Sequence, residues 1–274
     1  MVGTSGGVMK IGIIQGRLSE PKEGFQECPR NFRREFDLLP ELGLNHIEWI
    51  ITKENFDTNP IFYQTEEHSL KEYPISSVCA DFMVDDDFCD SEYLEKFLKP
   101  TCEVAKHTGI KFITIPLLEK SKIKKDDKAK KFIEAFYPYT KEYKDINFLI
   151  EAELHQKKLK KVLDLNSNLF VTYDTGNITS QELNHEEYIL ELRDKIKQVH
   201  IKDRIVHKRR NNMRTYETVE PGYGDTDFRL IFNCLKKINY NGLYTLQTAR
   251  LETGKEIETI KRHKKIIEDL YNGY

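Results

Sequence analysis

Short apolar runs alternate along the chain with longer segments in which apolar residues recur every three or four positions. The short runs are typical of buried β-strands and the longer segments of amphipathic helices. The predicted strands are Lys10–Gly16, His46–Ile51, Ile75–Asp81, Lys111–Leu117, Asn147–Leu154, Leu169–Asp174, Ile196–Arg204 and Leu243–Arg250. The predicted helices are Asn31–Leu42, Glu92–Thr108, Lys124–Lys144, Gln156–Leu165, Asn184–Arg193, Phe228–Ile238 and Glu256–Leu270.

This alternation predicts parallel strands joined by crossover helices. Eight such units in 274 residues are what a single-domain (β/α)₈ TIM barrel needs, and we assign it residues 10–274. A doubly wound open sheet is the alternative, but its first turn is usually rich in glycine, and the chain has only Gly16 there. Residues 1–9 are small and weakly apolar, which predicts a flexible leader or a remnant of cloning.

Composition narrows the functional classes. With 39% hydrophobic residues the chain can bury a large core, and a net charge of −2 argues against a nucleic-acid binder that works through bulk charge. No apolar run approaches ~20 residues, so no membrane span is expected. Five cysteines without a CxxC pair predict free thiols and a cytoplasmic location. A homo-oligomer is left open.

Polar side chains stand at the ends of most predicted strands. In a barrel the carboxyl ends of all eight strands meet at one face, where catalytic groups gather. Two carboxylates, a histidine and an amide on four successive strands predict a site for a divalent cation, although each residue alone is also what a barrel rim would carry. In chain order these ends carry Gln15 and Arg17, Glu48, Asp81, Glu151 and Glu153, Asp174, His200 with Lys202, and Gln247.

The run VHIKDR at 199–204 carries the most chemistry in the fewest residues. Strand alternation places His200, Lys202 and Arg204 on one face, with Asp203 on the other. Basic residues near this face are candidates for contacts with an oxyanion or a phosphate. The predicted substrate-binding residues are Gln15, Arg17, Asp81, Glu153 and Arg204.

From Lys10 onward the sequence resembles the sugar phosphate isomerase/epimerase family, which has a xylose-isomerase-like barrel. The matching stretches are IGIIQGRL at 11–18, ELGLNHIEWI at 41–50, SVCADF at 77–82, the strand ending in Glu151, YDTGN at 173–177, VHIKDR, the pair Gly222 and Gly224, and LQTAR at 246–250. The resemblance implies a divalent ion held by Glu151, Asp174 and His200. The fourth ligand position is Gln247, and the metal is Mn, Mg, Co or Zn.

Gln247 departs from the family pattern, because many family epimerases have Glu at this position. An amide can bind a metal through its oxygen but cannot act as a general base. The usual pair of bases is therefore incomplete, and Glu151 is the predicted base. Lys202 and Glu48 are further catalytic candidates, and Glu153 is another possible proton carrier.

These features predict a metal-dependent isomerase or epimerase of a small sugar or sugar phosphate. A carboxylate would move a proton next to a carbonyl through an enediolate, which a fixed positive charge stabilises. With one clear base, isomerisation or dehydration gains weight over epimerisation. The alternatives are a non-catalytic sugar-binding barrel, in which Gln247 marks lost activity, and an apurinic-site endonuclease, which needs more histidines at strand ends and a basic groove.

Overall fold

The computed structural model describes residues 9–21, 27–63, 69–85, 90–123, 126–208 and 214–273. Of the predicted leader, only Met9 is described, so the expectation for residues 1–8 lies outside the described residues. The described part of the chain contains no helix long and apolar enough to cross a bilayer.

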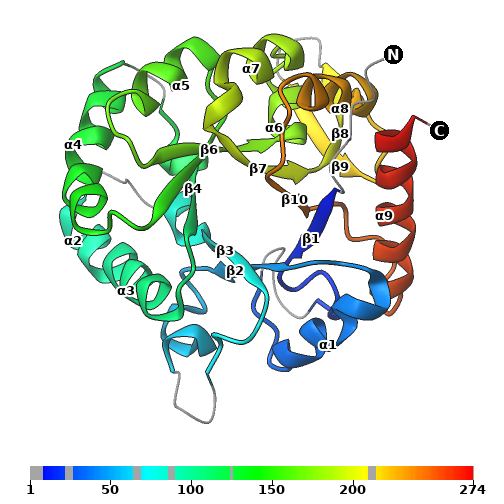
Figure 1. Ribbon diagram of the computed structural model, residues 1–274, viewed down its shortest axis with the longest axis horizontal. Coiled ribbons are helices and arrows are strands. Elements are labelled where there is room, and N and C mark those ends of the chain that lie inside the picture. Colours follow the sequence, from blue (N-terminus) through cyan, green and yellow to red (C-terminus); the bar gives the residue numbers. More distant parts are fainter. Residues whose placement is uncertain are drawn as a thin grey trace.

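Eight parallel strands close into a barrel, which confirms the predicted fold class (Figure 1). Each strand pairs with its sequence neighbours in the barrel, and the first pairs with the last, Lys10 beside Leu243. The barrel strands are β1 (Lys10–Ile14), β2 (Ile47–Ile51), β3 (Ile75–Ala80), β4 (Phe112–Leu117), β5 (Asn147–Ala152), β6 (Leu169–Asp174), β7 (Ile196–Ile201) and β10 (Leu243–Leu246).

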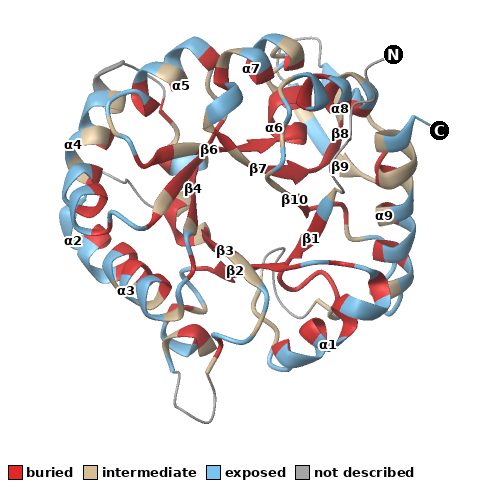
Figure 2. Ribbon diagram, viewed as in Figure 1, coloured by how far each residue is buried: buried red, intermediate tan, exposed pale blue. Residues whose placement is uncertain are grey.

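Helices surround the barrel and turn their buried faces toward it (Figure 2). Glycines in the left-handed conformation end several of them, as Gly43 and Gly109 do with φ of 61° and 80°. The longer helices are α1 (Phe32–Leu42), α3 (Lys99–Thr108), α4 (Asp126–Glu142), α5 (Gln156–Leu163), α7 (His185–Leu192), α8 (Phe228–Lys237) and α9 (Glu256–Asn272). The shorter ones are α2 (Ser91–Tyr93), a π-helical turn at Leu94–Leu98 that joins α2 to α3, and α6 (Thr175–Ser180).

Several strands end earlier than predicted, and the largest differences are at β7 and β10. The strand predicted to run to Arg204 stops at Ile201, and an antiparallel pair of strands, β8 (Asp203–Lys208) and β9 (Arg214–Val219), follows it. The Asp203 carboxylate explains the exit, because it accepts hydrogen bonds from the N–H groups of Gly222, Gly224 and Thr226. The last barrel strand likewise ends at Leu246 rather than Arg250.

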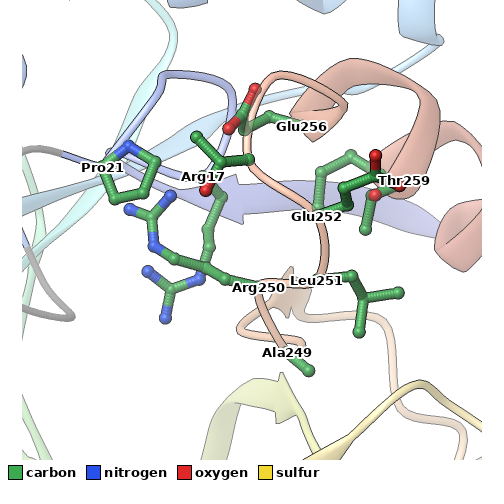
Figure 3. Close-up of a pocket in the computed structure, with 10 residues that line it drawn as sticks. Arg17, Pro21, Ala249, Arg250, Leu251, Glu252, Glu256 and Thr259 are labelled. Atoms are coloured by element: carbon green, nitrogen blue, oxygen red, sulfur yellow. The ribbon is translucent and has the colours of Figure 1, made fainter.

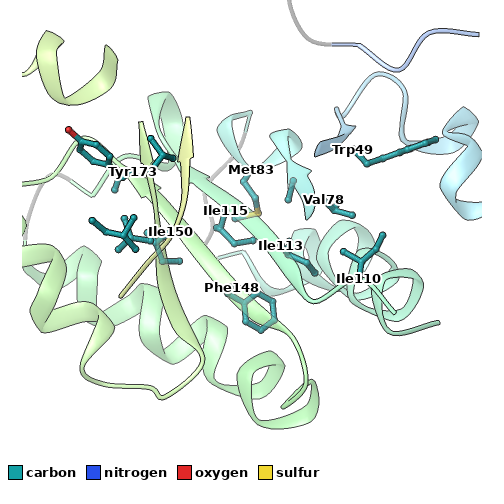
Figure 4. Packing of buried hydrophobic residues seen from close by; sticks show 14 of the residues in the cluster. Trp49, Val78, Met83, Ile110, Ile113, Ile115, Phe148, Ile150 and Tyr173 are labelled. Carbon is teal, nitrogen blue, oxygen red and sulfur yellow. The ribbon is translucent and has the colours of Figure 1, made fainter. Parts of the chain in front are cut away.

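Apolar residues on the outer face of the barrel pack against the helices. On β4 and β5, Ile113 pairs in register with Phe148 and Ile115 with Ile150, and all four are fully buried (Figure 4). Phe148 meets Phe136 of α4 edge to face at 6.3 Å. The alternate residues face the barrel interior, so this packing leaves the interior to polar side chains.

Polar residues fill the barrel interior near its carboxyl end. Thr114 of β4 donates a hydrogen bond to Glu48 of β2 and lies 3.3 Å from the Thr172 hydroxyl of β6. His200 of β7 contacts the same Glu48. All four residues are buried, and a buried polar network of this kind is stable only when its members are paired with one another.

His185 is expected to make the protein acid-sensitive. Burial lowers its pKa to about 4, whereas in the unfolded chain it titrates near 6.5. As the pH falls from about 6.5 to 4, the unfolded chain takes up a proton that the folded protein does not, so stability is lost over that window, by at most roughly 3 kcal/mol. Urea unfolding of His185→Gln, which can still hydrogen-bond Tyr173 and Thr179, should show a smaller loss between pH 6.5 and 4 than the native protein. An equal loss in both proteins would contradict this assignment.

Candidate active site

Three side chains from neighbouring strands converge at the carboxyl end of the barrel. Glu151 is the last residue but one of β5, Asp174 ends β6, and His200 lies beside Asp174 in the register of β6 and β7. One ligand atom from each lies within 4.8 Å of the others, and all three residues are buried. A nitrogen and two carboxylate oxygens at this spacing are a typical donor set for a divalent cation.

The Asp174 carboxylate is held from two sides. One oxygen accepts the backbone N–H of Asn177 at 2.8 Å and so caps α6, and the other accepts the Lys202 ammonium at 2.7 Å. Burial opposes ionisation, but Lys202, Arg204 and His200 outweigh it and lower the pKa of Asp174 to about 2. The lysine can approach because Gly176 has no side chain: a Cβ there would lie 2.8 Å from Lys202 Cγ.

Asn177 links Glu151 to Asp174. Its side-chain Nδ2 donates to Glu151 Oε1 at 2.7 Å, while its backbone N–H bonds to Asp174. The other oxygen of Glu151 lies 3.4 Å from His200 Nδ1. Asn177 is not among the site residues predicted from the sequence, although it closes the YDTGN stretch that carries the family resemblance.

Glu48 fixes the ring of His200 from below. Glu48 Oε2 lies 2.7 Å from His200 Nε2 and the residue is fully buried, which directs Nδ1 toward Glu151. Although burial favours the neutral ring, the two flanking carboxylates raise the pKa of His200 to about 10. A cation bound at Nδ1 would replace the proton there, because metal ligands bind in their deprotonated form.

Gln247 lines the cavity beside this cluster. It follows β10, its backbone N–H bonds to Ile201, and its side chain lines the same cavity as Glu151 and Lys202. Gln247 Oε1 is buried and has no hydrogen-bond partner among the described residues, and His200 Nδ1, which lies 3.4 Å from Glu151 Oε2, forms no hydrogen bond there. Buried polar atoms are rarely left without partners. The residues present therefore fit a divalent cation that takes Glu151, Asp174, His200 and Gln247 as ligands.

A cavity of about 780 Å³ opens above these residues. Its size lies within the range of small-molecule sites. Five of the predicted site residues line it, namely Asp81, Glu151, Lys202, Arg204 and Gln247. Arg204 donates to Ser180 Oγ at 2.9 Å and lies 4.1 Å above the ring of Tyr216.

The other predicted site residues do not line this cavity. Gln15 is buried, and its oxygen accepts the backbone N–H of Ile50. Glu153 forms an ion pair with Lys122 at 2.7 Å, and Glu48 lies in the barrel interior. Their geometry fits support of the barrel and of His200 better than contact with a substrate.

Arg17 and Arg250 form hydrogen bonds that connect the segments after the first and last barrel strands. Arg17 Nε donates to the carbonyl of Thr248, and Arg250 donates to the carbonyls of Gly16 and Ser19. The two guanidinium groups lie side by side next to a cavity of only about 30 Å³ (Figure 3). Burial and then the charge of Arg250 lower the pKa of Arg17 to about 9. In this structure Arg17 therefore connects the loop after β1 to Thr248, and its predicted contact with a substrate stays a prediction.

The sequence profile of the xylose isomerase-like TIM barrel family matches residues 36–269. No curated protein sequence matches the chain. Among solved structures, the IOLI protein with a zinc atom is similar, with a TM-score of 0.72, 17% identity and coverage of 97% of this chain and 99% of that one.

Two further solved structures resemble the chain across nearly its full length. D-allulose 3-epimerase from Methylomonas sp. in complex with D-allulose has a TM-score of 0.71, 16% identity and coverage of 96% of this chain and 97% of its own. A xylose isomerase-like TIM barrel protein from Mycobacterium smegmatis in complex with magnesium has a TM-score of 0.65, 13% identity and coverage of 95% and 96%. At these identities the likeness shows the shared fold.

Proposed function

The chain belongs to the xylose isomerase-like TIM barrel family, and from that premise we propose that it is a metal-dependent isomerase or epimerase of a small sugar. The observation that supports this most is the convergence of Glu151, Asp174 and His200 within 4.8 Å, beside a cavity at the catalytic face of the barrel. Solved structures of the same fold contain zinc, magnesium or D-allulose, which supports a metal-dependent reaction on a sugar.

The ligands proposed for the ion are Glu151, Asp174, His200 through Nδ1 and Gln247 through its amide oxygen. When bound, a divalent ion (Mn, Mg, Co or Zn) supplies positive charge that stabilises a developing oxyanion. Asn177 holds the Glu151 carboxylate by one oxygen, so the other faces His200. Lys202 places a second positive charge beside Asp174 at the cavity wall.

Glu151 is the proposed base. It would take the proton from the carbon next to the substrate carbonyl, and the electrons of that C–H bond would move to the carbonyl oxygen as the enediolate forms. Returning the proton to the former carbonyl carbon, while the hydroxyl proton of the adjacent carbon moves to the former carbonyl oxygen, completes an aldose–ketose isomerisation. Returning it to the opposite face of the same carbon needs a second acid, which Gln247 cannot provide. The single carboxylate therefore favours isomerisation.

Glu48 is proposed as a positioning residue for His200. Glu48→Gln is expected to weaken metal binding by about 10- to 100-fold, because the ring loses the carboxylate that fixes its Nε2 proton. Competition with a chelating dye measures the affinity directly. The exposed Glu134→Gln on α4 serves as the matched control and should bind metal like the native protein. An unchanged affinity in Glu48→Gln would argue against this role.

The proposal is tested on the purified full chain by metal analysis and by solvent deuterium incorporation into candidate ketoses. A bound divalent ion together with exchange that stops on chelation is the expected result. A protein that binds no divalent ion and exchanges no C–H proton in any ketose would overturn it.

The same experiment separates the two alternatives. A sugar-binding barrel, which Gln247 in place of a base would favour, binds a ketose without exchanging its C–H proton. The endonuclease alternative gains no support from the site, because His46, His185 and His263 are buried away from the cavity and carboxylates dominate its wall.

A further inference from the structure

The wall of the cavity is strongly acidic. Besides Glu151, six carboxylate residues line it, against three cationic ones, Arg30, Lys202 and Arg204. These carboxylates follow β1, β2, β3 and β4, which are neighbours in the barrel, so they form one side of the opening, across from Lys202 and Arg204 after β7. The six are Glu20, Glu27, Glu54, Asp81, Asp85 and Glu119.

Two of the three cations are already engaged. The Lys202 ammonium lies on Asp174 at 2.7 Å, and the Arg204 guanidinium bonds Ser180 and stacks on Tyr216. Arg30 is exposed at the mouth. Arg17 and Arg250 donate to main-chain carbonyls and do not line this cavity. The described cavity wall therefore has no arginine cluster of the kind that binds a phosphate group.

Asp81 is one of the carboxylates in the cavity wall. It follows β3, lines the cavity, and has no hydrogen-bond or ion-pair partner among the described residues. Burial raises its pKa to about 7, and the charges of Glu151, Asp85, Glu119 and Glu54 add to the effect. The same four carboxylates line the cavity, so a negatively charged group of a ligand placed beside them is repelled as well.

We propose that the substrate is uncharged, a free ketose or a related polyol. Its hydroxyl groups donate hydrogen bonds to the wall carboxylates, with Asp81 as a specificity-determining acceptor, and sugar phosphates and sugar acids are excluded by charge. This inference rests on the proposed sugar isomerase or epimerase function, because it names the substrate class of that same site.

The test compares a free ketose with its terminal phosphate at pH 8, where Asp81 is ionised. Deuterium incorporation gives kcat/KM for each, and isothermal titration gives each affinity without requiring turnover. We expect the free ketose to be preferred by both measures. Asp81→Asn should raise the relative kcat/KM of the phosphate by about tenfold, the effect of removing one nearby charge at a partly screened distance. Salt should narrow the preference in the native protein, because it screens charge repulsion.

Glu72→Gln is the matched control. Glu72 is exposed just before β3, at the opposite end of the strand from Asp81. The substitution therefore removes one negative charge, as Asp81→Asn does, without changing the cavity. The preference of this variant for the free ketose over its phosphate should equal that of the native protein. If Asp81→Asn does not fold, Glu119→Gln in the same wall should shift the preference in the same direction.

The possible failures are distinguishable. A native protein that prefers the phosphate, or variants that leave the preference unchanged, would overturn the inference while deuterium exchange still supports the proposed function. Absence of exchange with both ligands would overturn the proposed function. In that case tighter binding of the phosphate in the titration would overturn the inference as well, and tighter binding of the free ketose would support it.

Discussion

Glu151→Gln is expected to slow proton exchange at the substrate by about 100- to 10,000-fold, the usual contribution of a positioned general base. Glutamine keeps the size of the side chain and can keep an oxygen toward Asn177 Nδ2, so the local packing of α6 should survive. It cannot accept the proton. No other carboxylate in the predicted metal shell is free for this role, because Asp174 is bonded to Asn177 and Lys202.

Deuterium incorporation into the substrate measures this loss, and metal analysis must accompany it because Glu151 is also a proposed ligand. Exchange that is lost while stoichiometric metal remains would assign the defect to proton transfer. Glu134→Gln, the same substitution on the exposed face of α4, should exchange at the native rate. Exchange in Glu151→Gln within a factor of ten of the native rate would show that another group is the base.

Asp174→Asn is expected to weaken metal binding by more than about 100-fold. Loss of a residue that only orients a ligand costs 10- to 100-fold, and loss of a charged ligand should exceed that. Asparagine can still accept the Asn177 N–H and cap α6, so the fold should be kept. The remaining partners, Glu151 and His200, then compete for the ion beside an uncompensated Lys202 charge.

Equilibrium dialysis against the native protein measures the affinity, and circular dichroism checks the fold. Asp164→Asn, an exposed substitution at the end of α5, provides the control and should leave the affinity unchanged. Native affinity in Asp174→Asn would mean that the cluster at the ends of β5, β6 and β7 does not hold the ion.

Alternation of apolar strands and amphipathic helices was enough to predict the barrel, because every βα unit repeats the same local pattern. The same reasoning brought Glu151, Asp174 and His200 together before any coordinates, since parallel strands present their carboxyl ends at one face. The predicted strand was wrong at Arg204, because the alternation was extended past Ile201, where β7 ends. The hydrogen bonds that Asp203 accepts from residues about 20 positions later turn the chain there, and a local pattern does not contain them.

The residue pattern along the chain was enough to predict the fold class and the strand ends that bear the polar site residues. Both follow from hydrophobic periodicity and from the parallel topology that it implies. Tertiary structure alone decided which polar residues face the cavity and which support it. Glu48 lies under His200, Arg17 holds the loop after β1, and Asn177 joins two proposed ligands. The contact between Asn177 and Glu151 joins residues 26 positions apart, and that between Arg17 and Thr248 joins residues 231 positions apart. The closure of the barrel brings these partners together, and their neighbours in the sequence do not.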